Sequence, residues 1–435
     1  MRQTAFREYL KGALWAMPSL AVVVALLAGS ILSLINIPSG SPLAPVLFQG
    51  TSDDARTLLI GIASTMITVI ALVLGLTVVA LQLASTQFSP RLLRNFLRDL
   101  TNQLALSSFV ATFAYSTAGL YTVGVSAGRR TDDYPRLAVS GALVLLFISL
   151  LMLVFFVHHL AHSIQIDQVM ADVERATLHV VAHSLARGND IGGAIQVPGH
   201  AVPVAAVHSG YTQTFHLDGT VRAAAQSDVV VGLVPMIGEH VIVGAPVAWV
   251  WRRSDPTPLS PGGSEVAAIS DALDHGVRLG FERTAEQDAA FGVRQLADVA
   301  SKALSPAIND PYTAVQAVDH LSVILGALAR HPLGGQALTD ETGVPRVLVP
   351  GRDWAYFLDL GLGQVRRYGH TEPRVVIALL RVARDLAHFC GPERRASVRA
   401  YVEVLLEDVN RDVAQPTDRD PLIDRGQRLI AELSG

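Results

Sequence analysis

Four long apolar segments occupy the first part of the chain. They cover residues 13–37, 58–83, 104–125 and 137–160, and none of them contains Asp, Glu, Lys or Arg. Each is roughly 22–26 residues long, which is enough for a helix to cross the ~30 Å hydrocarbon core of a bilayer. Such a segment enters lipid without burying a charge. The pattern therefore predicts a four-helix transmembrane domain over residues 1–163.

The pattern changes twice after the fourth segment. Helical spacing of apolar residues continues to about Arg187, and Gly188 is suited to end a helix, so 164–188 is expected to extend the fourth helix into the cytoplasm. Short β-branched runs such as VPVAAV and DVVVGLV then predict a small β-rich domain over 189–253. Residues 254–265 have the composition of a linker, and 266–435 are expected to form a mostly helical cytoplasmic domain.

Composition supports membrane insertion. Half of the chain, 50%, is hydrophobic and only 17% is charged, which is typical of a polytopic α-helical membrane protein. The net charge of -4 gives no general attraction for nucleic acid. Arginines precede the first apolar segment and follow the second, so both termini are expected in the cytoplasm.

No motif in the sequence points to an enzyme. The chain has no Walker A, H-E-x-x-H or Rossmann glycine pattern, and Cys390 is its single cysteine. His158 and His162, like His179 and His183, have a spacing that can hold a metal but lack the carboxylate of a zinc-protease pattern. We therefore expect no catalytic residue, no cofactor and no metal.

The second apolar segment carries an unusual number of small and polar residues. Those that fall near one helical face are Ser64, Thr68, Gly75 and Gln82. They either line a pore, where dipoles replace the water around an ion, or let membrane helices approach closely, which is their commoner role. The arginines that follow share one face of a predicted helix and either bind lipid headgroups or form a cationic mouth. These arginines are Arg91, Arg94 and Arg98.

A tight corner between two helices is expected further along the chain. Thr284 and Gln287 have the spacing of a capping box and predict a helix over 284–304. Asp310 before Pro311 predicts the cap and first turn of the next helix. Pro373, Pro392 and Pro421 are likewise expected in first turns.

Polar residues surround this corner in the sequence, and two roles remain open for them. They are Arg283, Asp288, Asn309, Asp310 and Thr313. Their side chains either fix the corner or bind a small polar ligand. Turn and cap chemistry already accounts for most of them, which favours the structural role.

Two long stretches and two short ones resemble a known family. They are GFERTAEQDAAFGVRQLADVASKALSPAINDPYTAVQAVDHL (280–321), STMITVIALVLGLTVVALQLASTQFSPRLLRNFLRDLTNQ, FVHHLAHSIQI and HSGYTQTFHLDG. They are similar to domain-of-unknown-function family 2254, predicted bacterial integral membrane proteins. The resemblance implies four spans plus a cytoplasmic domain in the bacterial inner (plasma) membrane. It implies no activity.

Two hypotheses of function follow from these residues. The first is a homo-oligomeric ion channel or pore with a cytoplasmic vestibule and a preference for anions. The second is a membrane-tethered scaffold or sensor whose cytoplasmic domain binds a partner or a small ligand. Both expect the lipid bilayer as a partner and no nucleic acid.

Overall fold

The computed structural model describes most of the chain. The described residues are 15–35, 45, 47–87, 100–123, 134–163, 165–184, 188–191, 193 and 195–434. The chain divides into two compact units, Met1–Gln168 and Val169–Gly435. We call them the N-terminal unit and the C-terminal unit and describe each by itself.

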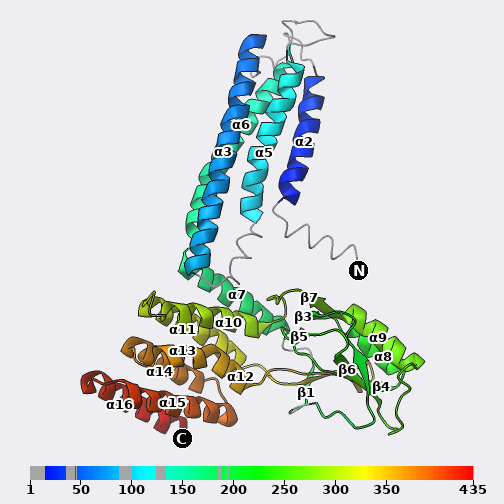
Figure 1. Ribbon diagram of the computed structural model, residues 1–435, viewed down its shortest axis with the longest axis vertical. Helices are drawn as coiled ribbons and strands as arrows, with labels where there is room; N and C mark the ends of the chain where they lie inside the picture. The colour runs from blue at the N-terminus through cyan, green and yellow to red at the C-terminus, as the bar shows by residue number, and fades with distance from the viewer. Residues whose placement is uncertain are drawn as a thin grey trace. The chain divides into compact units, whose positions relative to one another are not determined.

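The described part of the N-terminal unit contains four long helices. They are α2 (Ala16–Ser33), α3 (Ser52–Gln87), α5 (Leu100–Thr122) and α6 (Arg136–Ser163) (Figure 1). All four are long and apolar enough to span a membrane. The predicted number and order of apolar helices is therefore confirmed. Helix α5 packs against each of the other three, and buried residues such as Phe109 and Phe156 form the core between them.

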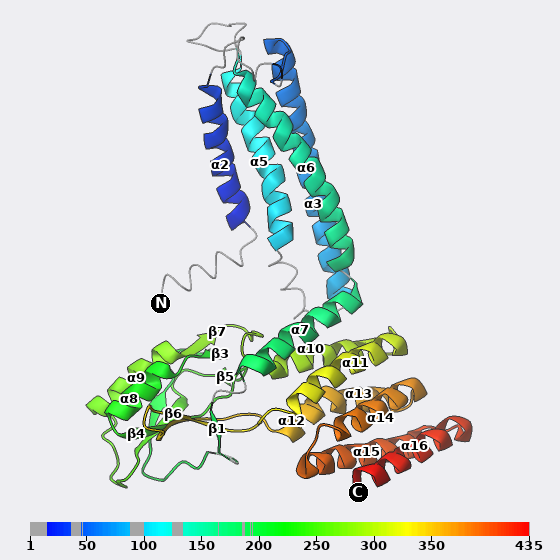
Figure 2. The ribbon, with the colours of Figure 1, turned by 180° about the vertical axis from the view of Figure 1, so that it is seen from behind.

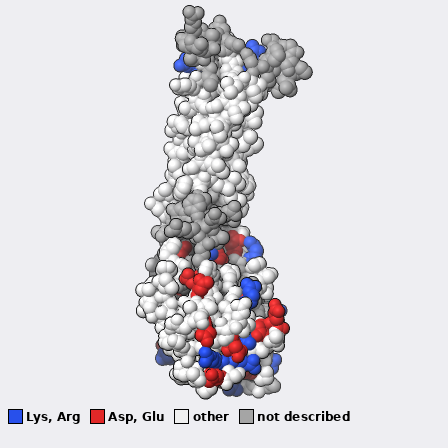
Figure 3. Space-filling view, turned by 90° about the vertical axis from the view of Figure 1, so that its right-hand side faces the viewer, with Lys and Arg blue, Asp and Glu red and all other residues white. Residues whose placement is uncertain are grey.

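The outer surface of these helices is apolar. Figure 3 shows charged side chains on the C-terminal unit, whereas the visible face of the four helices is almost free of them. Large apolar side chains such as Leu27, Leu72 and Leu151 are exposed. A surface of this kind is stable in contact with lipid rather than water.

The fourth apolar helix does not continue to Arg187 as expected. Helix α6 ends at Ser163, and a separate helix α7 covers Ile166–Ser184. The two helices have different surfaces, because α6 is apolar all round whereas α7 buries one stripe that includes Met170, Val173 and Thr177. Both sides of the break have helical spacing, so the pattern alone does not reveal a short interruption.

Two sheets form one side of the C-terminal unit. The six-stranded sheet has the order β1-β8-β9-β4-β6-β2. Its strands are β1 (Asn189–Asp190), β2 (Val202–Ala205), β4 (Val229–Leu233), β6 (Pro246–Arg252), β8 (Gln336–Thr339) and β9 (Pro345–Val349). Strands β4 and β9 pair in parallel, and Val231 lies opposite Val347. The three-stranded sheet has the order β5-β3-β7, from β3 (Gly210–Phe215), β5 (His240–Val241) and β7 (Val277–Gly280).

The expected separation into a β-rich domain and a helical domain is wrong. Strands β7, β8 and β9 come from the segment 266–435 and complete the sheets begun by 189–253. Helices α8 (Asp218–Gln226) and α9 (Ser264–Gly276) lie side by side in the same part of the molecule (Figure 2). Val347 packs into one apolar core with Val231 and Val250. Long-range strand pairing buries these residues together, and a local pattern cannot show which strands pair.

The remaining helices stack into a bundle. They are α10 (Ala289–Ala303), α11 (Pro311–Leu328), α12 (Trp354–Leu358), the π-helical turn η2 (Asp359–Gly363), α13 (Gln364–Gly369), α14 (Pro373–Ala387), α15 (Pro392–Asp412) and α16 (Pro416–Ser434). Leu296, Leu321 and Leu362 are fully buried between them. Burying a leucine side chain contributes roughly 1.5–3 kcal/mol. Pro311, Pro373 and Pro392 open helices as expected, whereas Pro421 lies inside α16.

Candidate functional site

The candidate pore-lining residues lie on an exposed face of α3. They are Ser64, Thr68, Gly75 and Gln82, and each is exposed in the N-terminal unit. The opposite face of α3 packs into the helical core through Leu59, Met66 and Val73. Packing within the chain therefore uses the apolar face of α3. The polar face is available to lipid, to water or to a second chain.

This exposed face has a seven-residue repeat. One position of the repeat is Gly61, Thr68, Gly75 and Gln82, and the other is Ser64, Ala71 and Val78, all exposed. A Cβ atom built at Gly61 or Gly75 would meet nothing within 4 Å. The Thr68 hydroxyl donates to the Ser64 carbonyl at 3.3 Å, within its own helix. Small residues with this period are typical of membrane helices that pack closely side by side.

The third span holds polar groups that the sequence pattern did not single out. Thr112 of α5 and Ser149 of α6 are buried. The hydroxyl groups of Thr112 and Ser149 lie 2.8 Å apart, and the Tyr115 hydroxyl donates to the Ala138 carbonyl at 2.9 Å. The sequence did carry a signal, because α5 is the least apolar of the four candidate spans. Polar groups within a membrane require protein partners, so the least apolar helix takes the central place.

The arginines after the second span belong to residues 88–99, which lie outside the described residues. They are Arg91, Arg94 and Arg98. Their expected role, as a cationic mouth or as headgroup contacts, stays a prediction.

The polar corner is divided by the structure into two groups. Arg283 and Asp288 lie before α10, whereas Asn309, Asp310 and Thr313 lie after it. The helix between them has 15 residues, which corresponds to a length of roughly 22 Å. The five residues therefore do not form one site.

The first group holds the start of α10. Asp288, not Thr284, is the N-cap, and its carboxylate accepts from the Phe291 backbone N–H at 3.0 Å. The expected helix over 284–304 thus begins five residues later, at Ala289. Arg283 donates to both carboxylate oxygens of Asp288. The turn at Gly238 lies directly against this pair, because a Cβ atom at Gly238 would overlap the Asp288 and Arg283 side chains. Gly238 also has a φ of +84°, a conformation that favours glycine. Both charges are therefore satisfied in a structural contact.

The second group forms the cap and turn that the sequence predicted. The Asp310 carboxylate accepts from the Thr313 backbone N–H at 3.1 Å and from its hydroxyl at 2.6 Å. These bonds hold the pKa of Asp310 below its usual value, because they stabilise the charged carboxylate. Asn309 has a positive φ of 49°, which this residue type tolerates in turns.

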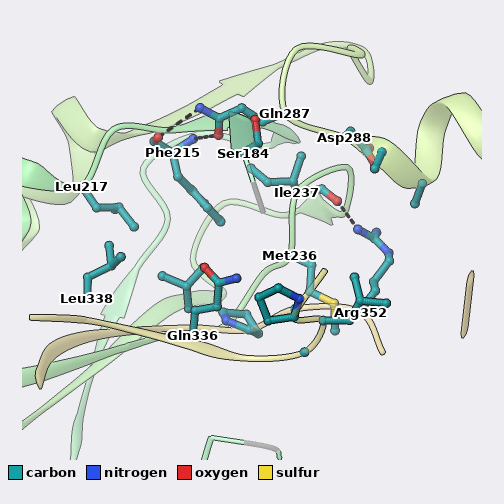
Figure 4. A pocket seen from close by; sticks show the side chains of 18 of the residues that line it. Ser184, Phe215, Leu217, Met236, Ile237, Gln287, Asp288, Gln336, Leu338 and Arg352 are labelled. Atoms are coloured by element: carbon teal, nitrogen blue, oxygen red, sulfur yellow. Dashed lines mark hydrogen bonds between the residues drawn. The ribbon is translucent and has the colours of Figure 1, made fainter. Parts of the chain in front are cut away.

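A pocket of about 460 Å³ lies beside the start of α10 (Figure 4). Residues of β3, the turn after β4, the β8–β9 hairpin and α12 also line it. Phe215, Leu217, Met236, Leu338 and Phe357 give it an apolar wall. Its volume lies within the usual range of small-molecule pockets.

The polar groups of this pocket are partly engaged by the protein. The Gln287 amide accepts from the Phe215 N–H at 2.8 Å and donates to the Phe215 carbonyl at 3.3 Å. Arg352 donates to the Ile237 carbonyl at 2.7 Å, and its guanidinium carbon lies 5.1 Å from the Tyr356 ring centre. Gln336 faces Phe215 across the space (Figure 4). The pocket combines an apolar wall with one cationic side chain, which suits a small organic molecule.

The histidine pairs make contacts within their own helices. The rings of His158 and His162 lie 4.2 Å apart, as do those of His179 and His183. His162 and His183 each place Nδ1 near a carbonyl one turn earlier. The part of the chain that the structure describes contains no group of three or more His, Cys, Asp or Glu that could hold a metal ion.

Comparisons with other proteins give a family and uncharacterized relatives. A family model described as "Predicted membrane protein (DUF2254)" matches residues 11–385. Uncharacterized proteins of Mycobacterium bovis and Mycobacterium tuberculosis are each 42% identical over 426 residues, which covers 96% of this chain and 80% of theirs. No solved structure matches the chain.

Proposed function

Because this chain belongs to the DUF2254 family of predicted membrane proteins, we propose that it acts as a homo-oligomeric channel or pore in which copies of α3 face one another. The observation that carries the proposal is the exposed seven-residue repeat of Gly61, Thr68, Gly75 and Gln82. Small and hydroxylated residues on an exposed helix face let a neighbouring helix pack closely or can line a file of water.

The same face has the chemistry that a conduction pathway needs. Serine and threonine hydroxyls and the Gln82 amide are uncharged dipoles that can replace water around an ion. Segment 58–83 contains no acidic residue, and three arginines follow it. In this proposal they attract anions at the inner mouth, and both termini lie in the cytoplasm of a bacterial inner membrane. The C-terminal units of the copies form the vestibule.

Cysteine cross-linking tests whether α3 faces a second copy. Thr68→Cys and Gly75→Cys, each in a Cys390→Ser background, are expected to form disulfide-linked dimers in native membranes. Ile67→Cys and Leu74→Cys are matched controls, because both positions are exposed but lie about 100° around the helix. Equal cross-linking at all four positions would show random collision. Linkage only at the control positions would place another face of α3 in the interface.

Reversal potentials in planar bilayers under a salt gradient test conduction. The wild-type protein is expected to prefer anions, and Arg94→Glu is expected to lower that preference, with a weaker effect at high salt because counter-ions screen the charge. A cation-selective wild type would contradict the role of the arginines. Absence of conductance across voltage and membrane tension would contradict the pore itself.

The pocket of about 460 Å³ favours a second candidate function, a membrane-tethered sensor of a small ligand. Its test is a thermal-shift screen of small organic acids on the full chain. A compound that acts through Arg352 is expected to raise the unfolding midpoint of the wild type and to act less on Arg352→Gln. Equal shifts in both proteins would place binding elsewhere.

A further inference from the structure

A groove between α14 and α16 is lined by arginines from both helices. It has a volume of about 250 Å³, and its polar lining residues are Arg381, Arg384, Arg425, Arg428 and Glu432. On each helix the two arginines are three residues apart, which places them on one face. Leu380 and Leu429, which also line the groove, are only 1% and 5% exposed. The packing of α14 against α16 therefore fixes the positions of the four arginine side chains in the groove.

The protein balances only part of this positive charge. Arg381 pairs with Asp319, and Arg384 pairs with Asp385. Arg425 and Arg428 are exposed and have no ion-pair partner among the residues that the structure describes. Glu432 is the single carboxylate in the lining of this groove. Like charges on neighbouring turns of a helix repel each other, and a bound anion would remove that repulsion.

We propose that this groove binds a small phosphate-bearing anion. A guanidinium group is planar and permanently charged, and it can donate two parallel hydrogen bonds to phosphate oxygens. Guanidinium groups from two helices can hold one phosphoryl group from more than one side. The volume of about 250 Å³ lies just below the usual range for drug-sized ligands. It suits one or two phosphoryl groups better than a large cofactor.

The phosphate can belong to a soluble metabolite or to a lipid headgroup, since both present the same oxygens. Calorimetric titration of the full chain in phosphatidylcholine nanodiscs distinguishes them, with pyrophosphate as one probe and short-chain phosphatidic acid as the other. The test variant is Arg425→Gln/Arg428→Gln. The control variant Arg253→Gln/Arg374→Gln removes the same number of charges at exposed positions outside the groove.

Binding of either probe to the wild type is expected to weaken by at least about tenfold in the test variant and to stay unchanged in the control. Binding of pyrophosphate would identify the ligand as a soluble metabolite, and binding of phosphatidic acid would identify it as a lipid headgroup. Unfolding midpoints without ligand show that both variants are folded. The proposal is overturned if neither probe binds the wild type, or if both variants bind as the wild type does.

Discussion

Single carboxylates decide where two of the helices begin. Asp288 and Asp310 each accept from the backbone N–H three residues later, and their backbone angles are nearly the same. The sequence identified Asp310 because Pro311 follows it and fixes the first turn. Asp288 has no proline after it, and Thr284 with Gln287 offered a competing capping box. The Gln287 side chain instead forms hydrogen bonds with the backbone of Phe215. This contact joins segments that are distant in the sequence, so no local pattern could predict it.

Removing the cap at Asp310 is expected to lower stability. Asp310→Ala should decrease the free energy of unfolding by about 0.5–2 kcal/mol, because the N–H of Thr313 loses its acceptor. Thermal unfolding of the full chain in detergent can be followed by tryptophan fluorescence, since Trp249, Trp251 and Trp354 lie in the C-terminal unit. Asp274→Ala, at an exposed position within α9, is the control and should have little effect.

The effect of Asp310→Ala should also depend on pH. The pKa of Asp310 is lowered in the folded protein by its bonds to Thr313. The charged Asp310 carboxylate therefore contributes its full stabilisation above about pH 3.9, the pKa of an aspartate in the unfolded chain. This contribution is lost as the pH falls through the lower pKa that Asp310 has in the folded protein. The difference in unfolding midpoint between wild type and variant should shrink below about pH 4. A difference that stays constant with pH would mean that the charged cap is not its source.

At the scale of elements, the contact between α7 and α10 leaves no space for a side chain at Gly292. A Cβ atom there would overlap the Thr177 hydroxyl and lie 2.9 Å from the Thr177 Cβ. Gly292→Ala is expected to lower the free energy of unfolding by roughly 1–3 kcal/mol through overpacking. Thr177→Ala in the same chain should recover part of the loss.

Gly219→Ala is the matched control for this contact, and unfolding midpoints measure both changes. Gly219 lies in α8, and a Cβ there would meet nothing within 4 Å. Alanine should stabilise the protein there slightly, since it restricts the unfolded chain. A stabilising Gly292→Ala would show that α7 does not pack on α10 this closely.

The sequence predicted elements well where the cause is local. Charge-free segments are sufficient to identify α2, α3, α5 and α6, and β-branched runs identify strands such as β4. Prediction from the sequence failed where contacts between distant residues determine the structure. Helix α8 lies between strands in a segment expected to be β-rich, and β9 joins the sheet from the segment expected to be helical. The polar residues of α3 and α5 look alike in sequence, and only helix packing makes one set exposed and the other buried.

At the scale of the whole molecule, crossing of the membrane by all four described apolar helices would place both termini on one side of it. The arginine bias predicts that this side is the cytoplasm. In a Cys390→Ser background, Pro258→Cys should resist a membrane-impermeant thiol reagent in intact spheroplasts and react after lysis. Pro45→Cys, at an exposed position between α2 and α3, should react in intact spheroplasts. Labelling of Pro258→Cys before lysis would contradict the orientation.

The parallel pairing of Val231 with Val347 has a consequence for biosynthesis. Strand β4 leaves the ribosome more than a hundred residues before β9, its neighbour in the six-stranded sheet. At about 5–20 residues per second, one edge of β4 stays open on the order of 10 s during translation. An open strand edge can pair with other chains. The nascent chain therefore passes through an interval in which the native pairing of β4 with β9 cannot yet protect this strand edge from aggregation.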